Sequence, residues 1–498
     1  FAVTVNPITT GVAFEGNTVY TSEVLTKFMD LQPGQVLNSV YVGQKVQGIN
    51  AAYARDGYML AHVDGIRVDD QGVLHVHIVE GIVEDIVPAG NKKTRDKVIT
   101  REFVQKKGKP FNKFLVRRSV ERVYNLGFFD DVNVRMLPGE KDPNNVIIEI
   151  DVLEHKTGTN TLGAGYSKSD GLMGIIEFGE DNFRGTGDKF KVHWEIGGKK
   201  KYKNYQISYL KPWIDSKGTS LGFSFFNRED EYTDYNEDGN EVAEYNKKSR
   251  GFNISFGRQT GEYTRDYLTL ESRKDSYKWD DDDSSGFRYD KNAGKGKNWN
   301  NGSYNFANDK YGDKNFGRIN SITWQKVYDS RDNIYEPTRG RRISYTAQWA
   351  GHGLGGDFDF YKFTAEARMY KKLGAKDVLA FRARGGFIQG DAPYSQLFTL
   401  GGADSLRGYE DDQFRGKYMY NATLEFRFPI VKKVSGVLFT DIGDAWDAPN
   451  VTWYNSKKTF NYGVGAGVRV TTPIGPVKLD YGVGKHKNKF HFSFGTQF

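Results

Sequence analysis

The stretch Phe190-Lys191-Val192-His193-Trp194-Glu195-Ile196 shows how most of this chain folds. Its apolar and polar residues alternate one by one, which is the period of a β-strand with one apolar and one polar face. The same alternation returns in Ile343–Trp349 and in Leu379–Arg384. A soluble sheet with one wet face and a barrel in lipid both use this pattern, so it predicts strands and leaves their surroundings open.

The overall composition favours the barrel. The chain has 498 residues and a mean hydropathy of −0.64, and it contains no run of about 18 apolar residues, which excludes a membrane protein built of helices. Only alternate residues of a barrel strand face lipid, so a low mean hydropathy is compatible with the 14% aromatic content. At roughly 20 residues for each strand and its connection, the chain after residue 156 predicts a transmembrane antiparallel β-barrel of about sixteen strands.

The connections between these strands are uneven in length. Residues Asn182–Gly187 predict a tight turn, whereas residues 274–317 form a long polar stretch. Short periplasmic turns and long outer loops are typical of outer-membrane barrels. The run Asp280–Asp283 lacks the spacing and the glycine of a calcium-binding loop, so we interpret it as a solvated charge run.

Nothing in the sequence indicates catalysis. Without cysteine the chain has no disulfide framework and no thiolate chemistry, and its eight histidines are scattered. The glycine pattern of Gly351–Gly356 joins two predicted strands instead of opening a helix, which excludes a dinucleotide site. A net charge of +7 is small beside 70 basic and 63 acidic residues, so no nucleic-acid partner is expected. We expect no enzyme activity, no cofactor and no metal.

The first third of the chain is a repeated module. Gly16-Asn17 returns as Gly90-Asn91, and Val79-Glu80 returns at the same spacing as Leu153-Glu154. Each unit contains a predicted amphipathic helix after an asparagine suited to cap it, followed by strand-like runs. We expect two α+β domains, residues 1–82 and 83–155, each in the order strand, helix, helix, strand, strand, and then a barrel over residues 156–498.

Such a small sheet leaves one edge strand open, and an open edge can accept an extended peptide through main-chain hydrogen bonds. The modules can equally be spacers, and the sequence alone favours neither interpretation.

Two further stretches stand out near the end of the chain. Arg407-Gly408-Tyr409 follows the glycine-rich Leu400–Gly402 and is too polar to face lipid; an exposed loop is its simplest interpretation. In the last strand, alternate aromatic residues lie on one face, and the chain ends on an aromatic, which resembles the sorting signal of outer-membrane barrels. These residues are Phe490, Phe492, Phe494 and Phe498. Because the chain begins at Phe1 without an initiator Met or a signal segment, we expect a longer natural protein.

The order of several motifs resembles the BamA family of outer-membrane protein assembly factors, whose periplasmic modules are called POTRA domains. The motifs are Asn125–Phe129, Asn182–Gly187, Leu406–Tyr409, Asn421–Pro429 and Phe439–Gly443. The resemblance covers nearly the whole chain and implies two POTRA domains, a barrel of sixteen strands, and a bacterial outer-membrane location with the POTRA domains in the periplasm. It also implies unfolded outer-membrane β-barrel proteins as clients, and accessory lipoproteins or periplasmic proteins as possible partners of the POTRA domains.

By the same resemblance, Leu406-Arg407-Gly408-Tyr409 would be the tip of the sixth extracellular loop, folded back into the lumen. It would lie near the strand that carries Phe439, Asp441 and Gly443. A buried guanidinium needs an acidic partner, and Asp441 can supply one. We hypothesise that Arg407 and Asp441 pin the loop.

The family further implies a seam between the first strand, about Thr159–Ser169, and the last, about Lys489–Phe498. The first-strand residues of interest are Leu162, Gly163, Gly165 and Tyr166. Glycine contributes no side-chain pairing, so we expect a weak seam that opens sideways and pairs with a client strand. Two alternatives remain: a two-partner-type transporter that secretes a polypeptide, and a passive porin, which has no use for two periplasmic modules.

Overall fold

The protein was studied as a computed structural model. The structure describes residues 6–167, 171–197, 202–236, 238–239, 241–278, 287–288, 316–333, 336–374, 376–449, 456–472, 475–485 and 487–494. It forms two compact units, Phe1–Gly158 with Glu180–Asp188, and Thr159–Gly179 with Lys189–Phe498, which we describe one at a time. Asp280–Asp283, the charge run noted above, lies outside the described residues.

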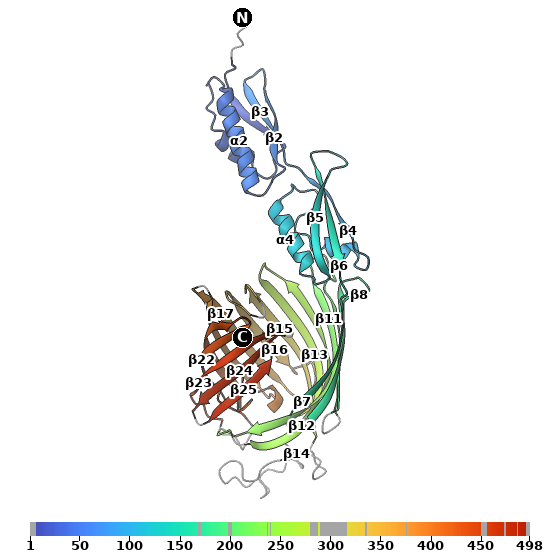
Figure 1. Cartoon of the computed structure of the whole chain (residues 1–498), viewed down its shortest axis with the longest axis vertical. Coiled ribbons are helices and arrows are strands. Elements are labelled where there is room, and N and C mark those ends of the chain that lie inside the picture. The colour runs from blue at the N-terminus through green and yellow to red at the C-terminus, as the bar shows by residue number, and fades with distance from the viewer. Residues whose placement is uncertain are drawn as a thin grey trace. The chain divides into compact units, whose positions relative to one another are not determined.

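The first unit contains both modules, each in the predicted order of strand, helix, helix, strand, strand (Figure 1). The first module consists of β1 (Gly11–Glu15), α1 (Ser22–Met29), α2 (Ser39–Arg55), β2 (His62–Val68) and β3 (Val73–Val79). The second consists of β4 (Val83–Ala89), α3 (Asp96–Thr100), α4 (Lys113–Tyr124), β5 (Phe129–Pro138) and β6 (Val146–Glu154). The sheet orders are β1-β3-β2 and β4-β6-β5, so the last strand of each module lies in the centre of its sheet.

The long helices begin where the capping asparagines predict. The Asn38 side chain accepts hydrogen bonds from the N–H groups of Val40 and Tyr41, at 3.0 and 3.2 Å. Asn112 accepts the equivalent bonds from Phe114 and Leu115, at 2.9 and 3.3 Å. Each cap satisfies two N–H groups that have no partner within the helix.

The repeated Gly-Asn and apolar-Glu pairs meet in each module, which explains why they recur together. Gly90 has a φ of 81°, and a Cβ there would lie 2.3 Å from the carbonyl oxygen of Val152 in β6. Glu154 then accepts hydrogen bonds from the N–H groups of Lys93 and Thr94, at 2.8 and 2.6 Å. Burial opposes ionisation of Glu154, but these hydrogen bonds outweigh it and lower the pKa of the carboxyl.

The first module has the same arrangement. A Cβ at Gly16 would meet the carbonyl oxygen of Ile78, and Glu80 accepts hydrogen bonds from the N–H groups of Thr18 and Val19. There the carboxylate also accepts a bond of 2.8 Å from the Tyr53 hydroxyl. Burial, followed by this carboxylate, raises the pKa of Tyr53.

The second unit is a closed antiparallel barrel. In the described part of the chain it has sixteen long strands and one two-residue strand, β14 (Phe287–Arg288). The long strands are β7 (Gly158–Ser167), β8 (Gly171–Phe183), β9 (Asp188–Gly197), β10 (Tyr202–Lys211), β11 (Ser220–Tyr235), β12 (Glu241–Gln259), β13 (Thr264–Lys278), β15 (Arg318–Asp329), β16 (Gly340–Ala350), β17 (Phe360–Leu373), β18 (Asp377–Gly390), β21 (Tyr418–Val431), β22 (Val434–Trp446), β23 (Asn461–Thr472), β24 (Gly475–Gly484) and β25 (Asn488–Phe494). Strand β25 lies next to β7 and closes the wall, which confirms the predicted fold class.

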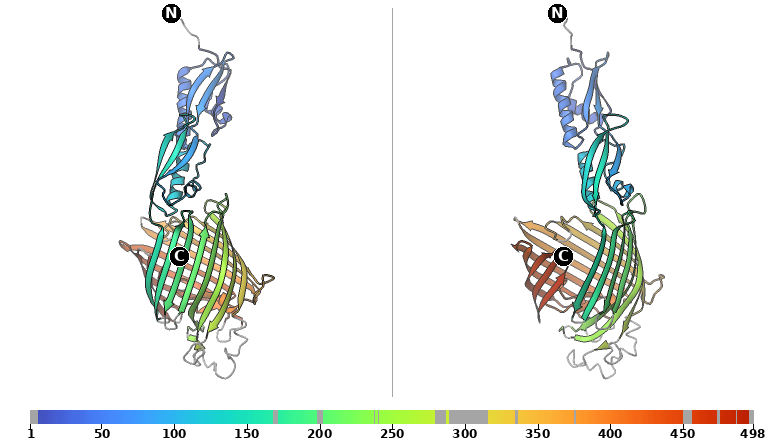
Figure 2. Two further views of the ribbon diagram at one scale, coloured as in Figure 1. Left: turned by 90° about the vertical axis from the view of Figure 1, so that its right-hand side faces the viewer. Right: turned by 45° about the vertical axis from the view of Figure 1, so that its right-hand side comes forward.

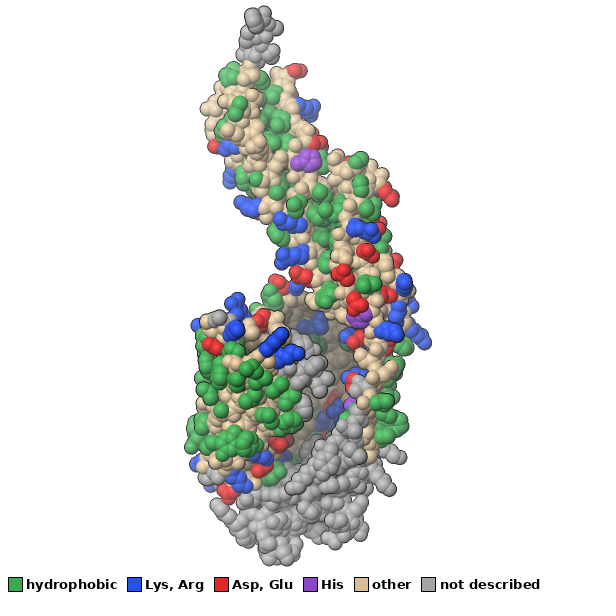
Figure 3. Space-filling view, viewed as in Figure 1, with side chains coloured by type: hydrophobic (Ala, Val, Ile, Leu, Met, Phe, Trp, Pro, Cys, Tyr) green, Lys and Arg blue, Asp and Glu red, His purple; other side chains and the backbone are tan. Residues whose placement is uncertain are grey.

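The alternation seen in the sequence separates the two faces of this wall. Trp194 and Ile196 of β9 project outward and are exposed, whereas Lys191, His193 and Glu195 line the inside. Figure 2 shows β8 to β13 side by side across one wall, and Figure 3 shows hydrophobic side chains gathered on the outer surface over β22–β25. In the described residues, no helix is both long and apolar enough to cross a membrane.

Candidate functional site

The connection between β18 and β21, residues 391–417, forms what we call the inner loop. It contains a short helical turn, Tyr394–Gln396, and two short strands, β19 (Phe398–Leu400) and β20 (Phe414–Gly416), that pair with each other. An apolar cluster holds this loop together, and its members include Leu397, Leu400, Leu406, Tyr409 and Phe414. The loop is therefore a packed element and not the exposed hairpin that its polarity suggests.

Arg407 lies at the centre of the loop, and its side chain is only 4% exposed. Its Nε and Nη2 donate to the two carboxylate oxygens of Asp441 on β22, at 2.7 and 2.8 Å. Its Nη1 donates to Glu425 on β21 at 2.7 Å and to Asp480 on β24 at 3.3 Å. One guanidinium thus joins three strands of the wall, with the bidentate geometry that favours Arg over Lys.

Two further arginines balance the charge of these carboxylates. Arg427 donates from Nε to Glu425 at 2.9 Å. Arg469 on β23 donates from Nη1 and Nη2 to Asp480, at 2.5 and 3.0 Å. Three buried arginines therefore face three buried carboxylates. Buried charges are tolerated only when they are paired in this way, so removal of any one member leaves an uncompensated charge.

Glycines let the backbone of the inner loop lie directly against the wall. A Cβ at Gly463 of β23 would lie 2.0 Å from the Arg407 carbonyl oxygen, and one at Gly482 of β24 would lie 2.5 Å from the Gly408 nitrogen. Gly408 has a φ of 95°, and a Cβ there would lie 2.5 Å from the nitrogen of Gly484. We call Gly463, Gly482 and Gly484 the glycine seat. Glycine inside a strand often marks such a close backbone approach.

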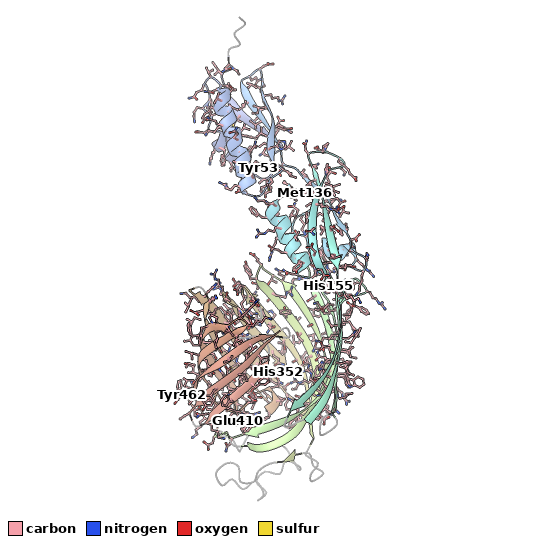
Figure 4. All side chains as sticks on the ribbon, in the orientation of Figure 1. Tyr53, Met136, His155, His352, Glu410 and Tyr462 are labelled. Atoms are coloured by element: carbon pink, nitrogen blue, oxygen red, sulfur yellow. The ribbon has the colours of Figure 1, made fainter. Side chains whose placement is uncertain are left out.

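Tyr409 binds the inner loop to the wall next to the glycine seat. Its hydroxyl donates to the Tyr462 carbonyl oxygen at 3.0 Å and accepts from the Lys485 N–H at 3.0 Å. Figure 4 labels Glu410 and Tyr462, which lie on the same side of the barrel. The loop is thereby bound to β21, β22, β23 and β24.

The structure brings together most of the residues that the sequence singled out here. Leu406, Arg407, Gly408 and Tyr409 lie in the loop, Asp441 binds Arg407, and the Phe439 ring lies 3.4 Å from the Arg407 guanidinium carbon. Gly443 lies instead against Tyr420 and Asn421 of the neighbouring strand.

Sequence reasoning missed Glu425, Arg427, Arg469, Asp480 and the glycine seat. Two signals were available: charged residues at inward positions of neighbouring strands, and alternate glycines in residues 463–467 and 482–484.

The predicted seam residues lie on β7 and β25. Leu162, Phe490 and Phe492 are exposed on the outside, at 82%, 78% and 59%. Gly163, Gly165 and Tyr166 belong to β7, and Phe494 ends β25. The side chains of Tyr166 and Phe494 and the whole of Phe498 are outside the described residues.

The turn Asn182–Gly187 has a role that its sequence did not reveal, because residues Glu180–Asp188 belong to the first unit. Lys93 of the second module donates to Glu180 at 2.9 Å and to Thr157 at 3.1 Å. Asn182 donates to the Thr94 hydroxyl at 2.7 Å, and a Cβ at Gly185 would lie 1.8 Å from the Lys93 carbonyl oxygen. The turn is therefore docked on the second module.

Comparison with known proteins gives two family matches. The profile described as the Omp85 superfamily domain matches residues 182–498, and the POTRA profile, described as surface antigen variable number repeat, matches residues 7–81 and 82–155.

Curated relatives cover nearly the whole chain. The outer membrane protein assembly factor BamA of Nitratidesulfovibrio vulgaris is 26% identical over 98% of this chain and 61% of its own length. BamA of Neisseria meningitidis serogroup B is 26% identical over 86% of this chain and 58% of its own. The chloroplastic outer envelope protein 80 of Oryza sativa is 24% identical over 97% and 73%. The chain thus spans about three fifths of the bacterial relatives.

Solved structures share the fold at low identity. The BamA of Haemophilus ducreyi lacking POTRA domains 1–3 has a TM-score of 0.64 at 20% identity, over 99% of this chain and 100% of that one. CdiB from Escherichia coli has a TM-score of 0.67 at 14% identity, over 100% of this chain and 91% of that one.

Proposed function

Because this chain belongs to the Omp85 superfamily and carries two POTRA domains, we propose that it folds and inserts β-barrel proteins into the outer membrane. It is an outer-membrane protein with its POTRA domains in the periplasm. We propose that it works without enzymatic chemistry, through a lateral seam between β7 and β25. The curated relatives named as outer membrane protein assembly factors support this function.

The observation that carries the proposal is the difference between the seam and the wall beside it. Arg407 of the inner loop forms buried ion pairs with β21, β22 and β24, whereas the described residues of β25 contact the loop through the Gly408–His491 hydrogen bond and the partly exposed Glu410–Lys489 pair. An unpaired backbone group in lipid costs several kcal/mol, so an open seam needs a strand to cover it. A client strand that pairs with the exposed edge would exchange one set of backbone hydrogen bonds for another.

Within this mechanism, the Arg407–Asp441 pair has a mechanical role. It stiffens the wall next to the seam, so that separation is confined to β7 and β25. The clients would be unfolded outer-membrane β-barrel proteins. The open sheet edges of the POTRA domains could bind extended client segments, accessory lipoproteins or periplasmic proteins.

A cysteine tether tests the seam. The chain contains no native cysteine, so pairs placed along β7 and β25 can be screened for one that forms a disulfide. In proteoliposomes, the oxidised tether should stop accelerated folding of an unrelated barrel protein, and reduction should restore it. A matched control joins the registered pair Val468 and Leu479 of β23 and β24 and should leave activity unchanged. Full activity of the oxidised seam tether would refute lateral insertion.

Secretion of a polypeptide through the lumen is the second candidate, because the CdiB fold is similar over the whole chain. The same proteoliposomes separate the two functions. Insertion yields a protease-resistant client in the bilayer, whereas secretion delivers a soluble chain to the other side. Solute leakage without either product would instead indicate a porin.

A further inference from the structure

The inner loop also holds the last strand, on its lumenal side. The N–H of Gly408 donates to Nε2 of His491 on β25 at 3.0 Å, and the His491 side chain is buried. Two residues away, the Lys489 ammonium pairs with the Glu410 carboxylate of the loop. Neither β25 residue belongs to the buried charge cluster around Arg407.

The hydrogen bond fixes the chemistry required at position 491. Nε2 can accept only when the imidazole is neutral and its proton is on Nδ1. The Gly408 N–H lies in the glycine seat, where a Cβ on Gly482 would come within 2.5 Å of its nitrogen. Gly408 is buried, and His491 gives its N–H group an acceptor.

The position of β25 makes this contact consequential. Through Arg407 and Tyr409, the loop is bound to β21, β22, β23 and β24. His491 and Lys489 extend the same attachment to β25, which pairs with β24 on one side and forms the seam on the other.

We propose that His491 and Lys489 are positioning residues that latch the last strand to the inner loop. Seating of the loop and closure of the seam are thereby coupled. The latch rests on the proposed function, since it acts on the seam through which clients would insert. While the loop is seated, β25 stays with the wall, and its release requires loss of the Gly408–His491 bond and the Glu410–Lys489 pair.

Pulsed electron paramagnetic resonance can test the latch without any client. Spin labels at Leu162→Cys and Phe490→Cys, both exposed on the outer face, report the separation of β7 and β25 in nanodiscs. His491→Phe keeps the ring volume but removes the acceptor, and we expect the long-distance population to grow about fivefold. His491→Gln restores an acceptor and should return the distribution to that of the labelled parent.

Matched variants separate the latch from general loosening. His193→Phe alters another lumenal histidine, one that contacts Glu177 of the neighbouring strand β8 and Glu195 of its own strand β9, and should leave the distances unchanged. Lys489→Met should widen them, whereas Lys489→Arg should not. If His491→Phe fails to fold, the two variants Lys489→Met and Lys489→Arg still test the latch. Their β7–β25 distances, and the hydrogen exchange of β25, can then be compared with those of the labelled parent.

Each outcome of these measurements either supports the latch or overturns it. Parent-like distances in both His491→Phe and Lys489→Met would overturn the latch. Equal widening in His491→Phe and His491→Gln would show that ring packing, and not the hydrogen bond, holds the strand. If the distances widen but client insertion in proteoliposomes does not change, the latch stands and the proposed lateral function fails.

Discussion

The two sides of the barrel lumen are lined by similar charged residues but differ in what covers them. At β21–β24 the inner loop leaves a cavity of only about 20 Å³ beside Arg407. At β8–β11 the polar side chains of Glu177, Lys191, His193 and Arg228 line a cavity of about 530 Å³. The first volume holds about one water, whereas the second holds many.

An inward-facing charge therefore stiffens the wall only where another part of the chain excludes water from it. Coulomb interactions in water are weak, and solvated ion pairs contribute about 0–1 kcal/mol. Under the inner loop the same interactions are strong, and an unpaired group there is penalised heavily. The loop thus converts one part of a polar lumen into a rigid wall and leaves the opposite part adaptable.

The largest effect is expected for Arg407→Ala. Asp441, Glu425 and Asp480 would lose a shared cation, and we expect the barrel to lose about 3–5 kcal/mol of unfolding free energy. Urea unfolding in lipid measures this directly. Arg407→Lys should recover only part of the loss, since an ammonium cannot bind Asp441 in the bidentate geometry.

The matched control is a residue of the β8–β11 side, which lines the large cavity. Arg228 is exposed and lines the large cavity, so Arg228→Ala should change the unfolding free energy by less than about 0.5 kcal/mol. Similar losses in both variants would abolish the distinction between the two sides.

A smaller loss of unfolding free energy is expected for Gly482→Ala. Its new methyl would lie 2.5 Å from the Gly408 nitrogen, and overpacking of this kind costs about 1–3 kcal/mol. Gly385→Ala on β18 is the control, because a Cβ there meets only the Met419 oxygen, at 3.8 Å. Thermal unfolding should separate the two variants, and equal midpoints would mean that the loop backbone does not rest on the seat.

The sequence was informative where a pattern is local. The period of two predicted the barrel strands, and Asn38 and Asn112 marked the starts of two helices because a cap acts within three residues. Arg407 and its need for an acid were also visible, and the family resemblance led to Asp441. Glu425 and Asp480 were not predictable as partners, because they lie on strands whose register only the closed barrel fixes.

The same limit applies to the turn Asn182–Gly187. Its glycines predicted a tight turn, but the close approach of Gly185 to Lys93 depends on tertiary structure. Likewise, His491 had no sequence feature that distinguished it from the other seven histidines, since its contact is with a loop residue 83 positions earlier.

In the second module, backbone N–H groups take the place of arginine as the partners of a partly buried carboxylate. Glu154 is held by the N–H groups of Lys92, Lys93 and Thr94, and its pKa is lowered although burial opposes this. A lowered folded pKa gives stability that is full above the unfolded value of about 4.3 and is lost as pH falls through the folded value. We expect the second module to loosen below about pH 4.

Glu154→Gln should lower the unfolding free energy of the second module by about 2 kcal/mol at neutral pH and should remove this acid dependence. Hydrogen exchange of β6 and of residues 92–94 in the whole chain measures both effects. Asp130→Asn, an exposed acid of the same module, is the control and should keep the parent's acid profile. An unchanged profile in Glu154→Gln would assign the acid sensitivity to another carboxyl.

The smallest effect is expected for His193→Leu on the open side. His193 contacts Glu177 and Glu195 at 3.2 and 2.8 Å, yet all three line the large, hydrated cavity, where water can replace each lost contact. The unfolding free energy should therefore change by less than about 0.5 kcal/mol. A loss comparable to that of Gly482→Ala would show that the open side is also braced, and that the inner loop is not what distinguishes the two halves of the lumen.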